Sequence, residues 1–252
     1  MIHFVGAGPG DPDLITVKGQ RLLAAADLII YAGSLVNPAL LAMAKPGCAI
    51  HDSAALDLDQ VISLMGEAAA RGHATVRLHT GDPSIYGAIR EQMDRLRARG
   101  IAFEQVPGVS SFFAAAAALK AEYTLPGITQ TVILTRMEGR TAVPGPEAIR
   151  SLASHGSTMV VFLSVHQIDG LVGELLAGGS YRADTPVAVV HKASWPDQRI
   201  VRGTLADIAA AVETAGIRKT ALVVIGDFLG DEYELSKLYD PGFSHGYRQA
   251  RE

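Results

Sequence analysis

The sequence predicts an α/β protein made of two α/β domains. Short runs rich in β-branched residues alternate with helical patterns through the first half, which is typical of a mostly parallel sheet. A Tyr-Thr-Leu-Pro-Gly segment ending at Gly127 interrupts this alternation and is the candidate hinge. The 252 residues are enough for two compact domains. We therefore expect an N-terminal domain over 1–120 and a C-terminal domain over 121–252.

The first domain is expected to contain four strands, each followed by a helix. A helix is expected over 14–26, another opens at Asp57, a third contains Ile89 and a fourth begins near Ser110. The second is the best supported, because Asp57 is a plausible N-cap, Gln60 completes a capping box and Gly72 supplies a C-terminal stop. Apolar residues recur there at i, i+3, i+4 and i+7: Leu58, Val61, Ile62 and Met65. The strands are expected over 2–5, 28–31, 74–78 and 102–106.

The second domain is expected to contain a sheet of mixed direction. Helices fall between its strands, including one capped by Thr204 with Leu205, Ile208 and Val212 facing inward. A strand-turn pair over 194–201 suggests antiparallel pairing in this half. The strands are expected over 131–135, 158–163, 186–191 and 221–225.

Composition excludes several classes of protein. The net charge is −4 and no basic tract is present, so nucleic-acid binding lacks its electrostatic footprint. Gly, Pro or charged residues interrupt every apolar run before it reaches the ~18–20 residues of a spanning helix, and the N-terminus has no basic signal-peptide region. The single Cys48 excludes a disulfide framework, and the scattered histidines predict no metal site. We expect a soluble, cytoplasmic protein.

A glycine-rich loop follows the first strand. Gly6-Ala7-Gly8-Pro9-Gly10-Asp11 resembles a dinucleotide-binding turn, but Asp11 stands where that fingerprint needs its third glycine. The second strand also ends in Tyr31-Ala32-Gly33, without the acidic residue that would hold a ribose. These two departures argue against a nicotinamide site. A purely structural turn stays open for this segment.

Two further loops offer similarly exposed backbone. Thr80-Gly81-Asp82-Pro83-Ser84-Ile85-Tyr86-Gly87 follows one strand, and Pro107-Gly108-Val109-Ser110-Ser111 follows another and opens a helix, whose N-terminus favours a carboxylate. In a parallel sheet, loops at the carboxyl ends of strands form the ligand-binding edge. Three such loops at one edge predict a site for a small polar ligand.

These loops resemble the signature segments of the tetrapyrrole methylase family, the class III S-adenosylmethionine methyltransferases. The segments are VGAGPGDPDLIT, GDPSIYG and VPGVSS, and the resemblance extends over about residues 2–230. It implies a cofactor cleft between two α/β domains, and a homodimer. Taken alone, Leu163 and Ala193 are typical of core packing and Asp82 of a turn or cap. The resemblance implies that S-adenosylmethionine contacts Pro9, Thr80, Gly81, Asp82, Ile85, Ser110, Ser111, Leu163, Ala193, Thr220 and Ala221.

Longer stretches narrow the resemblance within the family. They are YAGSLVNPALL, RLHTGDPSIYGAIREQM, LPGITQTVILTRMEGRT and HKASWPDQ. They imply methylation of carbon 11 of precorrin-4, or of its cobalt form, during cobalamin biosynthesis. A sister enzyme acting at another ring carbon, such as the uroporphyrinogen III enzyme, is the main alternative. Two further alternatives stay open. One is methylation of a modified histidine on a protein, as in diphthine synthesis. The other is a binding module that has no catalytic activity.

A tetrapyrrole substrate carries many carboxylates, so basic residues should gather near its site in this net acidic chain. Candidates in or beside the loops are Arg77, Arg136, Arg140, Lys192 and Arg199, each of which could instead be a solvated surface charge. Residues 135–141 contain a glycine and follow a strand, which suggests a mobile loop whose two arginines clamp carboxylates. No catalytic residue is assigned; His79, Tyr86 and Glu138 are the candidates for a base that removes a proton after methyl transfer.

Overall fold

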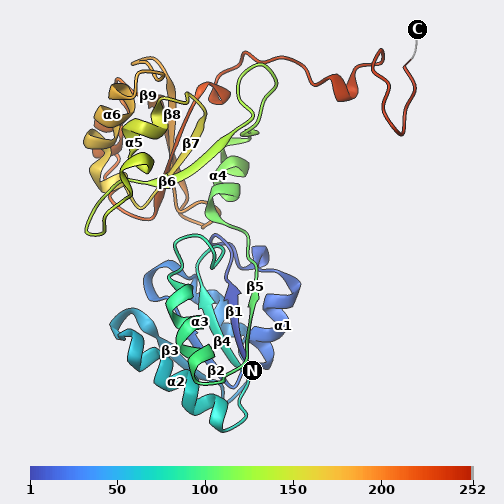
Figure 1. The fold of residues 1–252 in the computed structure, drawn as a ribbon, viewed down its shortest axis with the longest axis vertical. Helices are drawn as coiled ribbons and strands as arrows, with labels where there is room; N and C mark the ends of the chain where they lie inside the picture. Colours follow the sequence, from blue (N-terminus) through green and yellow to red (C-terminus); the bar gives the residue numbers. More distant parts are fainter. Residues whose placement is uncertain (251–252) are drawn as a thin grey trace. The chain divides into compact units, whose positions relative to one another are not determined.

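The computed structural model describes residues 1–250, which form two compact units (Figure 1). Unit 1 contains Met1–Ala118 together with Lys192–Arg199, and unit 2 contains Leu119–His191 and the chain from Ile200. The predicted division assigned residues 192–199 to the second domain, whereas their contacts group them with unit 1. Among the described residues, no helix is long and apolar enough to cross a membrane.

Unit 1 is built on a five-stranded parallel sheet of order β3-β2-β4-β1-β5. The predicted strands and helices are confirmed, except that the first helix, capped by Thr16, begins at Val17, three residues after its predicted start. The sequence pattern missed β3, whose four residues are all exposed and therefore lack an apolar signal. The strands are β1 (Ile2–Gly6), β2 (Leu28–Tyr31), β3 (Ala49–Asp52), β4 (Thr75–His79) and β5 (Phe103–Val106).

Helices pack on both faces of this sheet, which is why nearly all residues of its central strands β2, β4 and β1 are buried. The helices that do so are α1 (Val17–Ala25), α2 (Leu58–Ala70) and α3 (Ile89–Ala98), and α4 (Ser111–Leu119) follows β5 along the chain. On one face, Phe4 and Ile30 of the sheet pack with Met65 of α2 and Leu96 of α3. On the other face, the core contains Leu23 of α1 and Leu40 of a 3₁₀ helix, Pro38–Met43. The predicted capping box of Asp57 and Gln60 begins α2.

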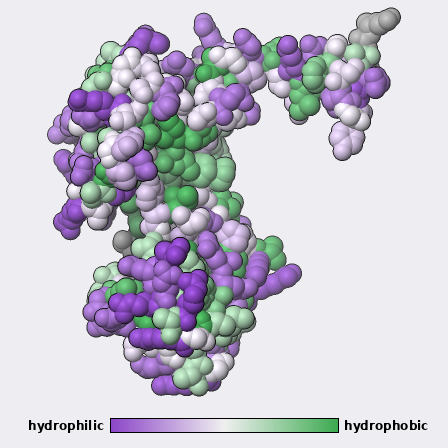
Figure 2. Space-filling view, viewed as in Figure 1, coloured by the Kyte–Doolittle hydropathy of each residue, from purple (hydrophilic) through white to green (hydrophobic). Residues whose placement is uncertain are grey.

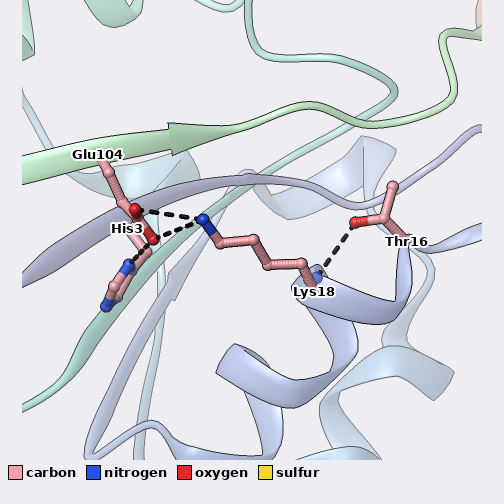
Figure 3. A network of polar contacts seen from close by, with 5 residues as sticks. His3, Thr16, Lys18 and Glu104 are labelled. Carbon is pink, nitrogen blue, oxygen red and sulfur yellow. Dashed lines mark hydrogen bonds and ion pairs between the residues drawn. The ribbon is translucent and has the colours of Figure 1, made fainter.

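A polar network ties the edge strand β5 to its neighbours (Figure 3). Glu104 of β5 accepts a hydrogen bond from His3 Nδ1 of β1 at 2.8 Å and one from Lys18 Nζ of α1 at 3.2 Å. These hydrogen bonds, from His3 first and then from Lys18, lower the pKa of the Glu104 carboxyl. Thr16 accepts from the Gly19 amide and begins α1 beside this network. The network therefore fixes the strand that leads into the third glycine loop.

Unit 2 contains a five-stranded mixed sheet of order β6-β7-β10-β8-β9. Strands β6 and β7 are parallel, whereas β10 is antiparallel to β7 and β8, so the predicted mixed sheet is confirmed. The strands are β6 (Val132–Arg136), β7 (Thr158–Phe162), β8 (Pro186–His191), β9 (Arg199–Thr204) and β10 (Ala221–Ile225). The helices are α5 (Ile149–Ala153), α6 (Ile168–Ala177) and α7 (Ile208–Thr214).

The three helices of unit 2 share one core with a face of its sheet. Leu171 of α6 and Ile208 of α7 pack in the same cluster as Met159, Val189 and Val223 of the strands. The predicted cap at Thr204 is wrong. The helix begins only at Ile208, because the Asp207 carboxylate accepts from the Thr204 amide at 2.7 Å and closes a turn before the helix.

The chain after residue 230 forms an arm with little packing of its own. Its backbone is anchored near its start, where the Glu234 amide donates to Pro126 O at 3.1 Å. Farther along, Arg248 donates to the carbonyls of Leu238, Asp240 and Phe243 and folds the arm on itself. Figure 2 shows hydrophobic and hydrophilic residues mixed along this arm.

Candidate functional site

Three glycine loops meet at the carboxyl edge of the parallel sheet in unit 1, as predicted. They follow β1, β4 and β5, which are adjacent in the sheet. Gly8 and Gly81 exchange backbone hydrogen bonds, with Gly81 N donating to Gly8 O at 2.8 Å. A Cβ on Gly108 would lie 2.2 Å from Gly81 O, and one on Gly6 would lie 2.5 Å from Gly108 Cα. Backbone therefore touches backbone at the centre of the site, and only glycine allows this approach.

Asp82 joins the second loop to the third. Its carboxylate accepts from the Ser84 amide and the Gly108 amide, both at 2.8 Å, and also from the Ser84 hydroxyl. Burial opposes ionisation of this carboxyl, but the hydrogen bonds from Ser84 and Gly108 outweigh burial and lower its pKa. Asp82 is thus an ionised group that holds the second and third loops together. Its sequence context alone suggests only a turn or cap residue.

The segment 192–199 holds the first loop from outside. Trp195 Nε1 donates to Pro9 O at 3.0 Å, and a Cβ on Gly10 would fall 2.0 Å from the indole. The Asp11 amide donates to Ser194 Oγ at 3.0 Å, and Asn37 Nδ2 donates to Gly10 O at 2.8 Å. Sequence reasoning missed Trp195, Ser194 and Asn37, because none of them lies in a glycine motif.

Strained backbone gathers at the predicted ligand segments. Seven non-glycine residues in the described chain have a positive φ, a conformation that costs energy and often marks a functional site. Leu163 and Thr220 are predicted cofactor contacts, Lys192 is a predicted substrate contact, and Tyr86 lies in the second glycine loop. The others are Ala88, Lys120 and Ser194.

Three predicted cofactor contacts belong to unit 2, and Leu163, Thr220 and Ala221 lie at one edge of its mixed sheet. Because β10 runs antiparallel to β7, the start of β10 at Ala221 lies at the edge where β7 ends beside Leu163. Ala221 also pairs with His191, the last residue of β8. The predicted contact Ala193 instead lies in the segment of unit 1 that contains Trp195, where it is buried. Leu163 is 59% exposed, so its side chain is not the core residue that its apolar context suggests.

Arg77 does not lie among the loops. It is buried in the middle of β4, where its guanidinium donates to Gln92 Oε1 at 3.1 Å and to Ile30 O at 3.2 Å. Burial lowers its pKa to about 10. The position of Arg77 therefore does not support the expected contact with substrate. Its guanidinium joins β4, β2 and α3 inside the core.

Arg136 and Arg140 lie together in unit 2, but they differ in what they contact. The Arg136 guanidinium donates to the carbonyls of Met137, Thr141 and Ala142 at 3.0–3.2 Å, and so holds the loop that follows β6. Arg140 is exposed on that loop. This loop is therefore braced by Arg136 and presents Arg140.

Two other predicted basic residues belong to the segment 192–199. Lys192 Nζ lies 2.5 Å from Asp197 Oδ2 and 5.4 Å from the centre of the Trp195 ring, so an acid neutralises its charge locally. Arg199 is exposed. Lys192 therefore contacts residues of its own segment, the one that holds the first glycine loop.

The three candidate bases occupy different environments. His79 is buried at the end of β4, its Nε2 has no hydrogen-bond partner, and burial together with the charge of Arg77 lowers its pKa to about 3. His79 is therefore neutral at pH 7 and its Nε2 is shielded from solvent. Tyr86 is 46% exposed in the second glycine loop, and Glu138 is exposed on the loop held by Arg136. Among the described residues, no group of three or more His, Cys, Asp or Glu could hold a metal ion.

Comparison with known proteins places this fold and site in a family. The sequence model of the Tetrapyrrole (Corrin/Porphyrin) Methylases matches residues 1–209. The chain belongs to this family. Among individual tetrapyrrole methylases, it is 56% identical to the cobalt-precorrin-4 C(11)-methyltransferase of Methanocaldococcus jannaschii over 99% of this chain and 96% of that protein.

Solved structures of tetrapyrrole methylases share the fold. A cobalt precorrin-4 methyltransferase, described as a cobalamin biosynthetic enzyme, superimposes with a TM-score of 0.89 at 49% identity, covering 91% of this chain and 96% of that one. The uroporphyrin-III C-methyltransferase of Thermus thermophilus, complexed with S-adenyl homocysteine, gives a TM-score of 0.74 at 30% identity, covering 90% and 92%. The predicted fold class is thereby confirmed.

Proposed function

We propose that this chain uses S-adenosylmethionine to methylate carbon 11 of precorrin-4 or of cobalt-precorrin-4. The observation that carries the proposal is its similarity, over nearly the full length of both chains, to an enzyme of that name. Similarity falls to 30% identity for a family member that acts on a different tetrapyrrole. The stretches 31–41, 77–93, 125–141 and 191–198 support the same substrate.

The glycine loops of unit 1 fit a small zwitterionic cofactor. At their meeting point the wall is backbone rather than side chain, so a ligand can approach the N–H and C=O groups closely. The third loop leads into α4, and the N-terminus of a helix has a positive dipole end suited to the cofactor's carboxylate. Ser110 and Ser111 place hydroxyls at that turn. When bound, S-adenosylmethionine supplies a methyl group already activated by its sulfonium.

Alignment is then the main task of the protein. The loops must hold the cofactor so that the ring carbon meets the methyl group in line, at about 3–3.5 Å. Asp82 and Trp195 contribute by fixing the loops rather than by touching the reacting atoms. Methyl transfer to carbon needs no nucleophilic side chain, and a proton leaves the macrocycle afterwards. Tyr86 and Glu138 have the exposure that acceptance of this proton requires, whereas buried His79 lacks it.

The test is a product assay with labelled cofactor. The protein is incubated separately with precorrin-4, cobalt-precorrin-4 and uroporphyrinogen III, and carbon NMR locates the label. We expect label at carbon 11 of one or both precorrin-4 forms. Label on uroporphyrinogen III alone would assign the chain to the sister activity. S-adenosylhomocysteine binding without any labelled product would instead identify a binding module.

A further inference from the structure

A pocket of about 370 Å³ opens at the carboxyl edge of the sheet in unit 2. Strands β6 and β7 are parallel neighbours with Arg136 paired to Phe162, so the segments that follow them emerge side by side. This is the edge at which α/β sheets bind ligands. The pocket is lined by Arg136, Met137, Gly139, Arg140, Thr141, Leu163, His166 and Gln167.

The walls of this pocket are held in place by hydrogen bonds of Ser164 and Arg136. Ser164, 1% exposed, accepts from the Met137 amide at 2.9 Å and donates to Phe162 O at 2.7 Å, which joins the two segments. Arg136 braces the loop 137–142 through three carbonyls. Leu163, another lining residue, has φ 55° and is exposed. Ser164 and Arg136 thus hold the two segments that line the pocket.

The lining carries positive charge without acidic compensation. None of the described residues that line the pocket is acidic, although the whole chain has a net charge of −4. Arg136 contributes charge, but its N–H groups are engaged by carbonyls. Arg140 and His166 are exposed on opposite segments. Gln167 Nε2 lies 3.1 Å from His166 Nε2, so a neighbouring side chain contacts the imidazole. An imidazole donates from at least one of its ring nitrogens.

We propose that this pocket holds one carboxylate arm of the tetrapyrrole, with Arg140 and His166 as its direct ligands and Arg136 as fixed background charge. The proposal rests on the proposed function for its substrate class. The volume is near the small end of ligand pockets, roughly 300–1,000 Å³, and so suits a side arm better than a whole macrocycle. The cofactor also has a carboxylate, and the experiment must separate these two sources.

The experiment uses the full-length protein and three readouts. These are KM for precorrin-4, the dissociation constant of uroporphyrin, a stable polycarboxylate porphyrin, and the dissociation constant of S-adenosylhomocysteine. The variants are Arg140→Gln and His166→Gln. Their matched controls are Arg182→Gln and His155→Gln, which are exposed in unit 2 but precede β8 and β7, at the opposite ends of those strands.

We expect each pocket variant to raise KM and to weaken uroporphyrin binding about fivefold, which corresponds to about 1 kcal/mol. The S-adenosylhomocysteine constant and both controls should stay at wild-type values. Weaker S-adenosylhomocysteine binding with unchanged uroporphyrin binding would assign the pocket to the cofactor and overturn the proposal. Normal methylation with unchanged KM in both variants would overturn it while the proposed function stands. Absence of methylation in the wild type, with uroporphyrin binding still sensitive to both variants, would refute the function and support the pocket.

Discussion

The glycine loops of unit 1 and the loop 137–142 of unit 2 are held in place by different means. In unit 1, backbone packs directly on backbone at Gly6, Gly81 and Gly108. In unit 2, side chains hold the loop: Arg136 donates to three of its carbonyls, and Ser164 accepts from the Met137 amide. Backbone contacts cannot yield to an added side chain, whereas a loop braced by a side chain can be released by one substitution. We therefore expect unit 1 to tolerate less change at its site than unit 2.

The largest effect is expected from Gly108→Ala. Its Cβ would lie 2.2 Å from Gly81 O, so the second and third loops must separate. We expect S-adenosylhomocysteine affinity to fall about 100-fold, or about 2.7 kcal/mol, because separated loops lose hydrogen bonds to the ligand worth about 0.5–1.5 kcal/mol each, or more to its charged groups. Calorimetry measures the affinity. Gly145→Ala is the control, since nothing lies within 4 Å of its Cβ. Equal affinity in the two variants would show that backbone contact does not fix this site.

Asp82→Ala should have the next largest effect. It removes the acceptor for the Gly108 and Ser84 amides and leaves the glycine contact itself in place. We expect cofactor binding to weaken by about 1–3 kcal/mol, the typical cost of losing a charge-assisted or buried hydrogen bond. Calorimetry with S-adenosylhomocysteine tests this. Asp13→Ala, an exposed acidic residue of the first loop, provides the control. An unchanged dissociation constant in folded Asp82→Ala would reduce Asp82 to a surface turn residue.

Acid should destabilise unit 1 through His79. Its folded pKa of about 3 lies below the value of about 6.5 for an unfolded histidine, so only the unfolded state gains a proton between these values. The contribution of His79 to the free energy of unfolding is complete above pH 6.5. It is lost as pH falls toward 3, at up to about 1.4 kcal/mol per pH unit. Between pH 6.5 and 5 we expect a loss of about 2 kcal/mol.

The single tryptophan, Trp195, lies in unit 1 and reports its unfolding by fluorescence. Urea titrations at pH 6.5 and 5 should show that His79→Phe removes most of the pH dependence, because phenylalanine keeps the stacking on Phe4 but cannot titrate. His155→Gln, at an exposed histidine, should keep the wild-type dependence. If His79→Phe were as acid-sensitive as the wild type, another group would be responsible.

The smallest effect is expected from Arg136→Lys. Lysine keeps the charge but lacks the planar fork that reaches three carbonyls. We expect KM for the tetrapyrrole to rise about fivefold, or about 1 kcal/mol, with S-adenosylhomocysteine affinity unchanged. Arg182→Lys serves as the control in steady-state assays. Full activity of Arg136→Lys would mean that charge alone matters there and that bracing of the loop does not.

The glycine loops could be predicted from the sequence because their signal is local. A strand followed by Gly and Pro places exposed backbone at a known edge of a parallel sheet, and the structure confirms that placement. Arg77 could not be placed in the same way. It lies in a strand whose residues are all buried, so alternation along the strand gives no indication that a charged side chain points into the core.

The partners of these loops escaped prediction for another reason. Trp195 contacts Pro9 across a sequence separation of 186 residues, and no periodicity or motif reports such a distance. His166 also lay outside every motif, and only the parallel pairing of β6 with β7 brings it to the loop of Arg140. Thr204 shows the opposite error, in which a local pattern predicted a role that the residue does not have. Threonine is a good N-cap residue, but here the Thr204 amide donates to the Asp207 carboxylate before the helix begins. Local patterns predict elements and loops; tertiary contacts decide which side chains complete them.

The contact between Gly10 and Trp195 also sets an order of events during synthesis. The five strands of unit 1 and the three glycine loops have all been made once residue 111 leaves the ribosome, but Trp195 has not. At about 5–20 residues per second, a gap on the order of 10–40 s separates the synthesis of Gly10 from that of Trp195. Throughout that interval the nascent first loop lacks the indole that covers it. The proposed cofactor site is therefore completed late in translation, although its first residues are among the earliest to emerge.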